Sequence, residues 1–424
     1  MKITSVKAQE ILDSRGNPTI EAVTTLEDGT TGWAGVPSGA STGAYEAVEL
    51  RDGDQSRYGG AGVLNAVENV NSEIFHVVVG LDAQDQTKLD QTMIDLDGTE
   101  NKADLGANAI LSVSLSAARA QANAEKKELY EYLTKFNPDF NGSYIMPIPE
   151  MNVSNGGKHA NWATDIQEYM LFPIGAKSTA EAIRMNAEVY QILKNIIKAK
   201  GYAITVGDEG GFAPNVTSNE EPFQLLSEAV QKAGYKLGED ISFGIDAAAS
   251  EFYSDGKYKL AKEGKIVTSD ELANFFTNLK TKYPIISMED TFAEDDWEAF
   301  QKFTAANPKL QTVGDDLYVT NVKRLQKGID NKTTNAILIK LNQIGTLTET
   351  INAILLARKN NMRSIVSHRS GETEDTFIAD LVVAMGTGQI KTGAPARSER
   401  VAKYNRLMRI ERQLGDKSTY FKFS

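Results

Sequence analysis

The chain has 424 residues, a formal net charge of −12 and no cysteine. Its length predicts two domains, or a small domain attached to a large barrel. The acidic charge disfavours nonspecific binding to nucleic acid and to anionic membranes, because both need a basic surface. The absence of cysteine excludes disulfides, thiolate catalysis and cysteine-ligated zinc.

The first residues, MKITSVKAQEILDSRG, carry charges throughout and contain no apolar run like that of a signal peptide. No stretch of the chain approaches the roughly 20 apolar residues that a helix needs to span a bilayer. We therefore expect a cytoplasmic protein that has no membrane span and binds no nucleic acid directly.

The N-terminal region is predicted to be α+β. The sequence TIEAVTTLEDGTTGWAGVP predicts two strands joined at Asp28 and Gly29, a pair typical of hairpin turns. The later segment LGANAILSVSLSAARAQANA has the pattern of a helix. Residues 136–149 are rich in Asn, Gly and Pro, so we expect a domain boundary there, with one domain at 1–136 and a second at 137–424.

Beyond this boundary, strand-like runs alternate with helical segments. One helix has a clear start signal, since Thr268 precedes Glu271 by the spacing of a capping box. Repeated strand–helix units predict a parallel sheet, and this many favour a closed α/β barrel over an open doubly wound sheet. The runs are ISFGID, IISMED, LQTVGDD, NAILIKL, RSIVSH and GQIKTG.

Each of these runs ends at or just before an ionisable side chain. Any single one is explained as an ordinary charged residue where a strand meets its loop. Six in succession argue for an active site, because barrel enzymes assemble their sites at the C-terminal ends of the strands. The six are Asp246, Glu289, Asp315, Lys340, His368 and Lys391.

The three carboxylates in this set predict a metal site. Asp246, Glu289 and Asp315 are hard oxygen donors without cysteine or paired histidine nearby, which suits Mg²⁺ better than Zn²⁺. Scattered surface acids are the alternative, but the strand–helix spacing that brings these three together favours a cation that offsets their repulsion.

The remaining groups predict acid–base chemistry on an anion. Lys340, Arg369 and Lys391, together with Ser370, can hold a phosphate or a carboxylate. Lys340 either forms a structural ion pair or, with its pKa lowered by nearby cations, takes a proton. Glu209, in GDEGGFAP, lies either in a simple turn or beside a substrate as its acid. Together they predict proton abstraction next to a carboxylate, with a metal stabilising the enediolate.

Several long motifs recur in order along the chain. They include ILDSRGNPTIE and VPSGASTG near the N-terminus, then NGGKHA, DIQEYM, GDEGGFAP, GIDAAASEFY, ILIKLNQIGTLTET, SHRSGETED and KTGAPARSERVAKYN. On these motifs the sequence resembles the enolase family essentially from end to end.

The resemblance implies an N-terminal α+β cap and an eight-stranded α/β barrel of enolase type, whose first strands depart from simple alternation. It implies a Mg²⁺-dependent, reversible dehydration of 2-phosphoglycerate to phosphoenolpyruvate in glycolysis and gluconeogenesis. Lys340 would remove the C2 proton, and Glu209 would assist loss of the C3 hydroxyl. Members of the family are usually homodimers and in some cases octamers.

The resemblance also assigns contacts to individual residues. Asp246, Glu289 and Asp315 would bind the tighter of two Mg²⁺ ions, and Ser41 would contribute to the second. The substrate contacts would be His159, Gln167, Glu168, His368, Arg369, Ser370 and Lys391.

Two residues depart from the family pattern. Thr291 follows Glu-Asp where the family usually has proline, and Trp162 stands where asparagine is common. Neither change removes a catalytic group, so we expect effects on rate or affinity and not on the type of reaction.

Three alternative functions stand beside this one. Residues 39–43 match the G-x-S-x-G pattern of serine hydrolases, but they lie before the barrel and not between a buried strand and a helix. An acid-sugar dehydratase or racemase would share the metal and the base, yet would not need Arg369 and Ser370 for a phosphate. A noncatalytic scaffold or surface-binding role could coexist with catalysis.

Overall fold

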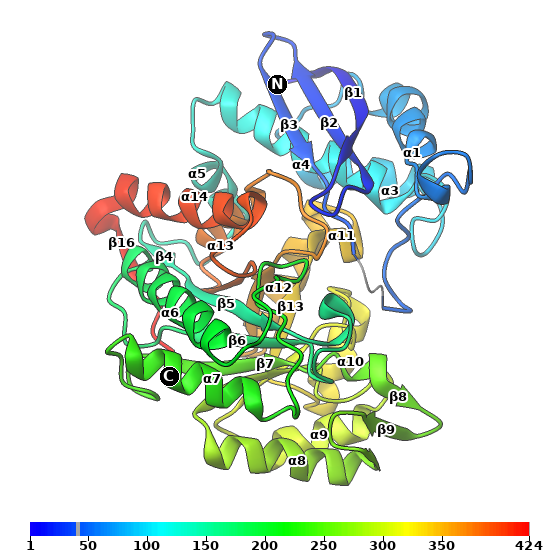
Figure 1. Cartoon of the computed structure of the whole chain (residues 1–424). Helices are drawn as coiled ribbons and strands as arrows, with labels where there is room; N and C mark the ends of the chain where they lie inside the picture. Colours follow the sequence, from blue (N-terminus) through cyan, green and yellow to red (C-terminus); the bar gives the residue numbers. More distant parts are fainter. Residues whose placement is uncertain (40–42, 424) are drawn as a thin grey trace.

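The computed structural model describes residues 1–39 and 43–423, which form an N-terminal α+β part and a C-terminal barrel (Figure 1). The N-terminal sheet has antiparallel strands in the order β1-β2-β3. The predicted hairpin is confirmed, since Gly29 lies in the turn between β2 and β3 with φ 85°. The strands are β1 (Ile3–Leu12), β2 (Pro18–Leu26) and β3 (Thr31–Gly35).

Helix α4 (Ala107–Ala124) packs against β2 and β3 and confirms the predicted helix. The packing is close, because a Cβ on Gly32 would lie 2.1 Å from the backbone nitrogen of Ala120. Glycine at this position therefore lets the sheet and the helix touch. Shorter helices complete this part of the fold: α1 (Leu64–Asn69), α2 (Phe75–Val78), α3 (Gln86–Asp97) and α5 (Leu129–Leu133).

The C-terminal part is a closed barrel with the strand order β11-β12-β13-β14-β15-β5-β6-β7. All six predicted strand runs are barrel strands, so the predicted barrel is confirmed. The opening strands depart from simple alternation, because β6 runs antiparallel to both β5 and β7. The strands are β5 (Ile148–Asn155), β6 (Glu168–Phe172), β7 (Ser242–Asp246), β11 (Ile285–Glu289), β12 (Gln311–Gly314), β13 (Ala336–Ile339), β14 (Arg363–Ser367) and β15 (Gln389–Lys391).

Helices surround the barrel and follow its strands. The capping box predicted for α8 is confirmed, since Thr268 and Glu271 each accept a hydrogen bond from the other's backbone N–H. Among the described residues, no helix is both long enough and apolar enough to cross a membrane. The helices are α6 (Thr179–Ala199), α7 (Glu221–Lys232), α8 (Ser269–Lys282), α9 (Trp297–Ala306), α10 (Val322–Asn331), α11 (Leu341–Ile344), α12 (Leu347–Lys359), α13 (Phe377–Met385) and α14 (Ser398–Leu414).

Two small sheets complete the C-terminal part. A three-stranded antiparallel sheet follows β7 along the chain and precedes α8. A pair of parallel strands joins the segment before β5 to the end of the chain. These strands are β8 (Tyr253–Ser254), β9 (Lys257–Leu260), β10 (Lys265–Val267), β4 (Tyr144–Met146) and β16 (Ser418–Tyr420).

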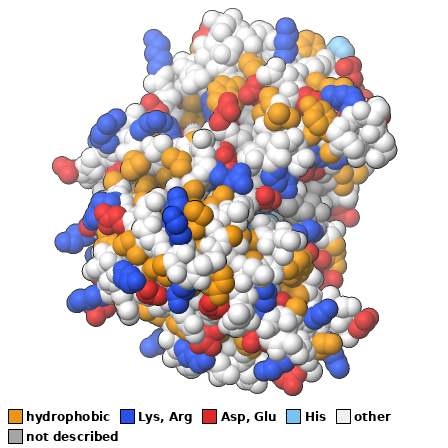
Figure 2. Space-filling model, in the orientation of Figure 1, with side chains coloured by type: hydrophobic (Ala, Val, Ile, Leu, Met, Phe, Trp, Pro, Cys, Tyr) orange, Lys and Arg blue, Asp and Glu red, His pale blue; other side chains and the backbone are white. Residues whose placement is uncertain are grey.

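The N-terminal part contacts loops that follow the barrel strands. Arg119 on α4 forms an ion pair with Asp375, which lies between β14 and α13. Ser38 forms a β-bridge with Gly371 in the same loop. The N-terminal part therefore lies over the end of the barrel where parallel strands finish (Figure 1). On the face seen in Figure 2, basic and acidic side chains are interspersed.

The barrel interior holds a buried acid that the sequence pattern did not single out. Glu150 on β5 is 1% exposed and pairs in register with Lys391 on β15. Its Oε1 has no hydrogen-bond partner among the described residues. Burial raises the pKa of Glu150 to about 8, against the opposing effects of Lys391 and Arg363. The carboxyl is therefore mainly protonated at neutral pH.

We predict that Glu150→Gln removes a pH dependence of folding stability. The folded-state pKa of about 8 exceeds the unfolded value of 4.5, so the bound proton stabilises the fold fully below pH 4.5 and this contribution is lost as the pH rises through 8. The free energy of unfolding of the variant, minus that of the wild type, should grow by roughly 1.4 kcal/mol per pH unit in this window and then level off. Urea unfolding measures this difference, and a constant value across the window would contradict the prediction.

Candidate active site

A pocket opens at the C-terminal ends of the barrel strands and collects most of the predicted site residues. Glu289 does not line the pocket but contacts Lys391, which does, and Ser41 falls outside the described residues. The predicted residues that line the pocket are His159, Gln167, Glu168, Glu209, Asp246, Asp315, Lys340, His368, Arg369, Ser370 and Lys391. Residues from both the first strands and the last strands of the barrel thus face one space.

Lys391 is the cation at the centre of this pocket. Its Nζ lies 3.0 Å from Glu168 Oε2, 3.2 Å from Asp246 Oδ2 and 2.8 Å from Glu289 Oε1. Burial lowers the pKa of Lys391, but Glu168, Glu289 and Asp246 outweigh burial and raise it well above its usual value. Lys391 is therefore an ammonium group held among three buried carboxyl groups.

Lys340, at the end of β13, forms an ion pair with Asp315 at the end of β12. Asp315 Oδ1 also accepts a hydrogen bond of 2.9 Å from Gln343 Nε2. Burial lowers the pKa of Lys340, yet the charge of Asp315 raises it above the usual value overall. In the site without metal, Asp315 therefore outweighs the repulsion from Arg369 and Lys391, and the expectation that Lys391 and bound Mg²⁺ together make this amine neutral stays a prediction.

The carboxylates at the strand ends fit a hard divalent cation. Asp290, Asp315 and Asp316 bring carboxylate oxygens within 4.8 Å of one another. Asp290 also accepts hydrogen bonds from the backbone N–H groups of Asp315 and Asp316, at 2.9 and 2.8 Å, and so fixes this turn. Burial and then the charge of Asp246 raise the pKa of Glu289 well above its usual value. Buried all-oxygen donors that repel one another are the chemistry of a Mg²⁺ site.

The predicted metal ligands form ion pairs with lysines in this structure. Asp246 and Glu289 contact Lys391, and Asp315 contacts Lys340. Among the described residues, the close carboxylate group is formed around Asp315 and does not include Asp246 and Glu289. A cation bound by all three would therefore take the place that the ammonium groups now hold.

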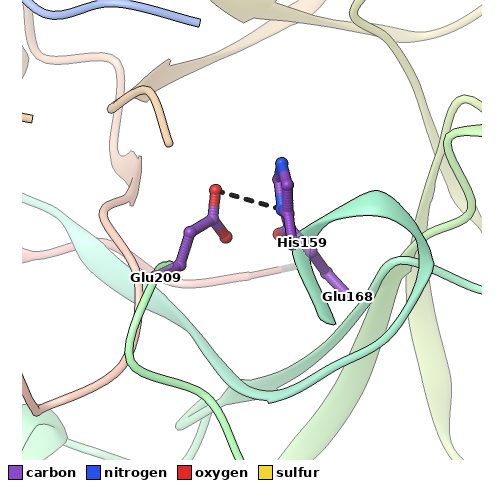
Figure 3. Close-up of side chains that lie close together, drawn as sticks. All are labelled: His159, Glu168 and Glu209. Carbon is purple, nitrogen blue, oxygen red and sulfur yellow. Dashed lines mark ion pairs between the residues drawn. The ribbon is translucent and has the colours of Figure 1, made fainter. Parts of the chain in front are cut away.

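A second cluster faces the carboxylates across the pocket. Glu209 Oε1 lies 3.5 Å from His159 Nδ1 and 3.4 Å from His368 Nε2. His159 Nδ1 is also 4.0 Å from Glu168 Oε1, and Figure 3 shows the ion pair between His159 and Glu209. Asn152 Nδ2 donates a hydrogen bond of 2.8 Å to Glu209 Oε2 and fixes the carboxylate from β5.

The protonation of this cluster follows from burial and charge. Burial lowers the pKa of both His159 and His368 below the usual range, so both imidazoles are neutral near pH 7. For Glu209, burial alone would raise the pKa, but His159, His368 and the cations Arg400 and Lys391 together lower it well below its usual value. The two histidines lower the pKa of Glu209 by charge only when they are protonated, whereas Arg400 and Lys391 are cations in either case and favour the carboxylate form of Glu209.

The glycines around Glu209 allow its loop to pack closely. A Cβ on Gly211 would lie 2.5 Å from Asn155 Oδ1, and one on Gly210 would lie 2.8 Å from the backbone oxygen of Ala396. Gly210 also has φ 86°, which favours glycine. The GDEGGFAP stretch is therefore a tight turn wedged between β5 and the segment after β15, and this packing brings Glu209 into the pocket.

Arg369, one of the expected anion-binding residues, is paired with a residue that the sequence pattern did not identify. Its Nη1 and Nη2 lie 2.9 and 3.1 Å from the two carboxylate oxygens of Glu46 in the N-terminal part. Its Nη1 also donates to Asn342 Oδ1 at 2.9 Å. An anion that binds Arg369 must therefore share the guanidinium with Glu46 or displace it.

Two family profiles match the chain over nearly its whole length. The profile described as Enolase, N-terminal domain, matches residues 3–133, and the profile described as Enolase, C-terminal TIM barrel domain, matches residues 143–423. The chain belongs to the enolase family. Enolases are metal-dependent, and the buried carboxylates at the strand ends are consistent with that property.

The two departures from the enolase pattern do not line the pocket but are close in sequence to Asp290 and His159, which do. Thr291 is fully buried, and its Oγ1 has no hydrogen-bond partner among the described residues. It follows Asp290, which has φ 40°. Trp162 is 41% exposed and has φ 60°, a conformation that bulky residues rarely adopt. The expected effect of these residues on rate or affinity stays a prediction.

Sequence reasoning missed four residues of this enolase site. Asp290 and Asp316 adjoin predicted ligands, so their position beside Glu289 and Asp315 was the signal that could have found them. Glu46 and Asn152 carried no such signal, because each reaches the pocket through a contact far along the chain. The four residues are Glu46, Asn152, Asp290 and Asp316.

We predict that Lys391→Met destabilises the metal-free protein by roughly 3–5 kcal/mol, because buried carboxylates lose their counter-charge. Mg²⁺ should then stabilise the variant more than the wild type, since a ligand that binds only the folded state raises its stability. Thermal unfolding with a chelator and with Mg²⁺ measures both effects.

The matched control is Lys102→Met, which removes another buried lysine, one paired with Glu349 outside the pocket. Its response to Mg²⁺ should equal that of the wild type. An equal response of Lys391→Met and Lys102→Met would count against a metal site at these carboxylates.

Proposed function

We propose that this protein is a hydro-lyase that interconverts 2-phosphoglycerate and phosphoenolpyruvate. The observation that carries the proposal is the pocket itself, in which Lys340, Glu209 and the anion-binding Arg369 line one space. The family relationship supports the same reaction. A base, an acid and a cationic binding wall are the groups that loss of water next to a carboxylate requires.

We infer that Asp246, Glu289 and Asp315 hold Mg²⁺, with Asp290 fixing the turn that carries Asp315. Ser41, which lies outside the described residues, is retained as the proposed contributor to a second ion. Bound Mg²⁺ supplies positive charge that stabilises the negative charge developing on the substrate carboxylate.

Lys340 is the proposed base at C2. In the free site it is an ammonium paired with Asp315, so the residue must give up its proton before it can take one from the substrate. Any cation that binds Asp315 offsets the negative charge of this carboxylate. The pKa of Lys340 then falls, which favours the neutral amine. The role of Lys340 is therefore tied to the state of Asp315.

Glu209 is the proposed acid at the C3 hydroxyl. It is a carboxylate in the free site, and it must be protonated before it assists loss of the hydroxyl. A substrate that carries both a carboxylate and a phosphate raises the pKa of Glu209 by charge repulsion. We propose that His159, Gln167, Glu168, His368, Arg369, Ser370 and Lys391 bind and orient that substrate.

The finer assignments follow the enolase family. We propose domain limits at 1–136 and 137–424, a cytoplasmic role in glycolysis and gluconeogenesis, and a homodimer or octamer. Sedimentation of the purified protein distinguishes these assemblies from a monomer. An acid-sugar dehydratase or racemase is the competing enzyme class, and a panel of acid sugars without phosphate tests it.

We predict Mg²⁺-dependent formation of phosphoenolpyruvate from 2-phosphoglycerate by the wild type. Lys340→Ala and Glu209→Gln should each lower the rate roughly 100- to 10,000-fold, the usual contribution of a general acid or base. The absorbance of phosphoenolpyruvate measures the rate. Lys359→Ala and Glu239→Gln alter exposed residues and serve as matched controls with unchanged rates. A folded wild type without activity would overturn the proposed function.

Exchange of the C2 proton separates the two roles. In D₂O, Glu209→Gln should still exchange the C2 proton of 2-phosphoglycerate, because the base remains when the acid is lost. Lys340→Ala should not exchange it. Proton NMR of the substrate follows the exchange, and rapid exchange by Lys340→Ala would show that another group is the base.

A further inference from the structure

We propose that Arg400 is a positioning residue that fixes His368 as a neutral ring with its proton on Nε2. His368 then presents a permanent N–H donor to the pocket beside Glu209, and it does not gain or lose a proton during the reaction. The significance for catalysis rests on the proposed function, whereas the protonation state of the ring is testable without turnover.

Arg400 lies on α14 and is fully buried. Its Nη1 lies 2.6 Å from His368 Nδ1. A guanidinium has donors but no acceptor and keeps its charge in proteins. Nδ1 must therefore accept the hydrogen bond, so it is unprotonated and the neutral ring carries its proton on Nε2.

The guanidinium is itself held in place on several sides. Nη1 also donates to the backbone oxygen of Arg369 at 2.5 Å, and Nη2 donates to the backbone oxygen of Ser370 at 2.5 Å. Nη2 is also 3.2 Å from the backbone oxygen of Asp208, the residue before Glu209. Arg400 thus joins the loop after β14 to the loop that carries Glu209.

Close packing leaves this arrangement little freedom. A Cβ on Gly393 would lie 2.7 Å from the backbone oxygen of Glu209, 3.1 Å from Arg400 Cδ and 3.2 Å from His368 Cε1. The three residues therefore meet around a glycine that has no room for a side chain. Turning the ring over would put Cδ2 in the place of Nδ1, so His368 would lose its contact with Arg400.

Burial and most of the charged groups that face His368 favour the neutral ring. Burial lowers the pKa of the ring well below its usual value; Glu209 opposes this, while Arg400, Lys391 and Lys403 add to it. A proton on Nδ1 would also point at the guanidinium. The neutral ring with Nε2–H is the form that both its contact with Arg400 and its burial favour.

This state defines what His368 can do. Its Nε2 lies 3.4 Å from Glu209 Oε1 and makes no hydrogen bond among the described residues, so the N–H is left for a group that enters the pocket beside the proposed acid. A protonated Nε2 can neither ligate a metal nor accept a proton. His159 differs, because its Nδ1 makes no hydrogen bond among the described residues and is not constrained in this way. Of the two rings beside Glu209, His159 is the one that can change its protonation state.

Nitrogen NMR of protein labelled with ¹⁵N-histidine tests the assignment directly, since the chain contains only 3 histidines. The expected spectrum shows His368 unprotonated at Nδ1, protonated at Nε2 and unchanged between about pH 6 and 8, where an ordinary histidine titrates. The His368→Gln variant assigns the signal by removing it. An Nδ1-protonated or titrating His368 in the wild type overturns the proposal.

Substitutions of Arg400 test whether this residue sets the protonation state of His368. Arg400→Met removes every donor, so the His368 signal should show mixed protonation and kcat should fall about 10- to 100-fold with a smaller change in KM. Arg400→Lys keeps one charged donor and should retain the Nε2–H form. Lys403→Met is the matched control, because it removes another fully buried cation from α14. Lys403 is paired with Glu372 and not with His368.

The outcomes are distinguishable. If Arg400→Met keeps both the wild-type signal and the wild-type kcat, the proposal fails. If Arg400→Met does not fold, the wild-type spectrum still decides the protonation state. If the spectrum is as expected but the wild type does not convert 2-phosphoglycerate, the proposed function fails and the assignment of His368 stands.

Discussion

Buried charge at the mouth of the barrel is the constraint on which the rest of the structure depends. Parallel strands end at one edge, and in this chain they end in acids and bases that have little contact with water. A buried charge without a partner destabilises a fold by several kcal/mol. The lysines meet this requirement by pairing with carboxylates, Lys391 with three of them and Lys340 with Asp315. The N-terminal part covers the mouth and contributes Glu46 as the partner of Arg369.

The same pairs explain why stability and function are coupled in this pocket. Lys340, Lys391 and Arg369 are the groups proposed to take a proton and to bind an anion, yet each is neutralised by an internal carboxylate. Cations and anions that enter the pocket can exchange partners with these pairs, so the total charge stays balanced. Arg400 does not take part in this exchange of ion-pair partners, because its guanidinium is hydrogen-bonded to backbone oxygens and to His368. It supplies positive charge without competing for substrate.

The sequence predicted the features that depend on local pattern. The spacing of apolar runs located six barrel strands, and their ends located Asp246, Glu289, Asp315, Lys340, His368 and Lys391 at one edge. Features that depend on contacts through space were not predictable in this way. Glu46 reaches Arg369 across 323 positions of sequence, and no local pattern marks such a pair. The pKa of Lys340 depends on whether Asp315 or Lys391 is the stronger influence, which only distances decide.

The central claim is that metal and substrate replace the internal partners of the buried charges. The most direct test is a crystal structure with 2-phosphoglycerate and Mn²⁺, in which anomalous scattering locates the metal. The account predicts Mn²⁺ bound by Asp246, Glu289 and Asp315, with Lys391 turned from these carboxylates towards the substrate. Metal bound elsewhere, or Lys391 still bridging Asp246 and Glu289 beside a bound substrate, would contradict it.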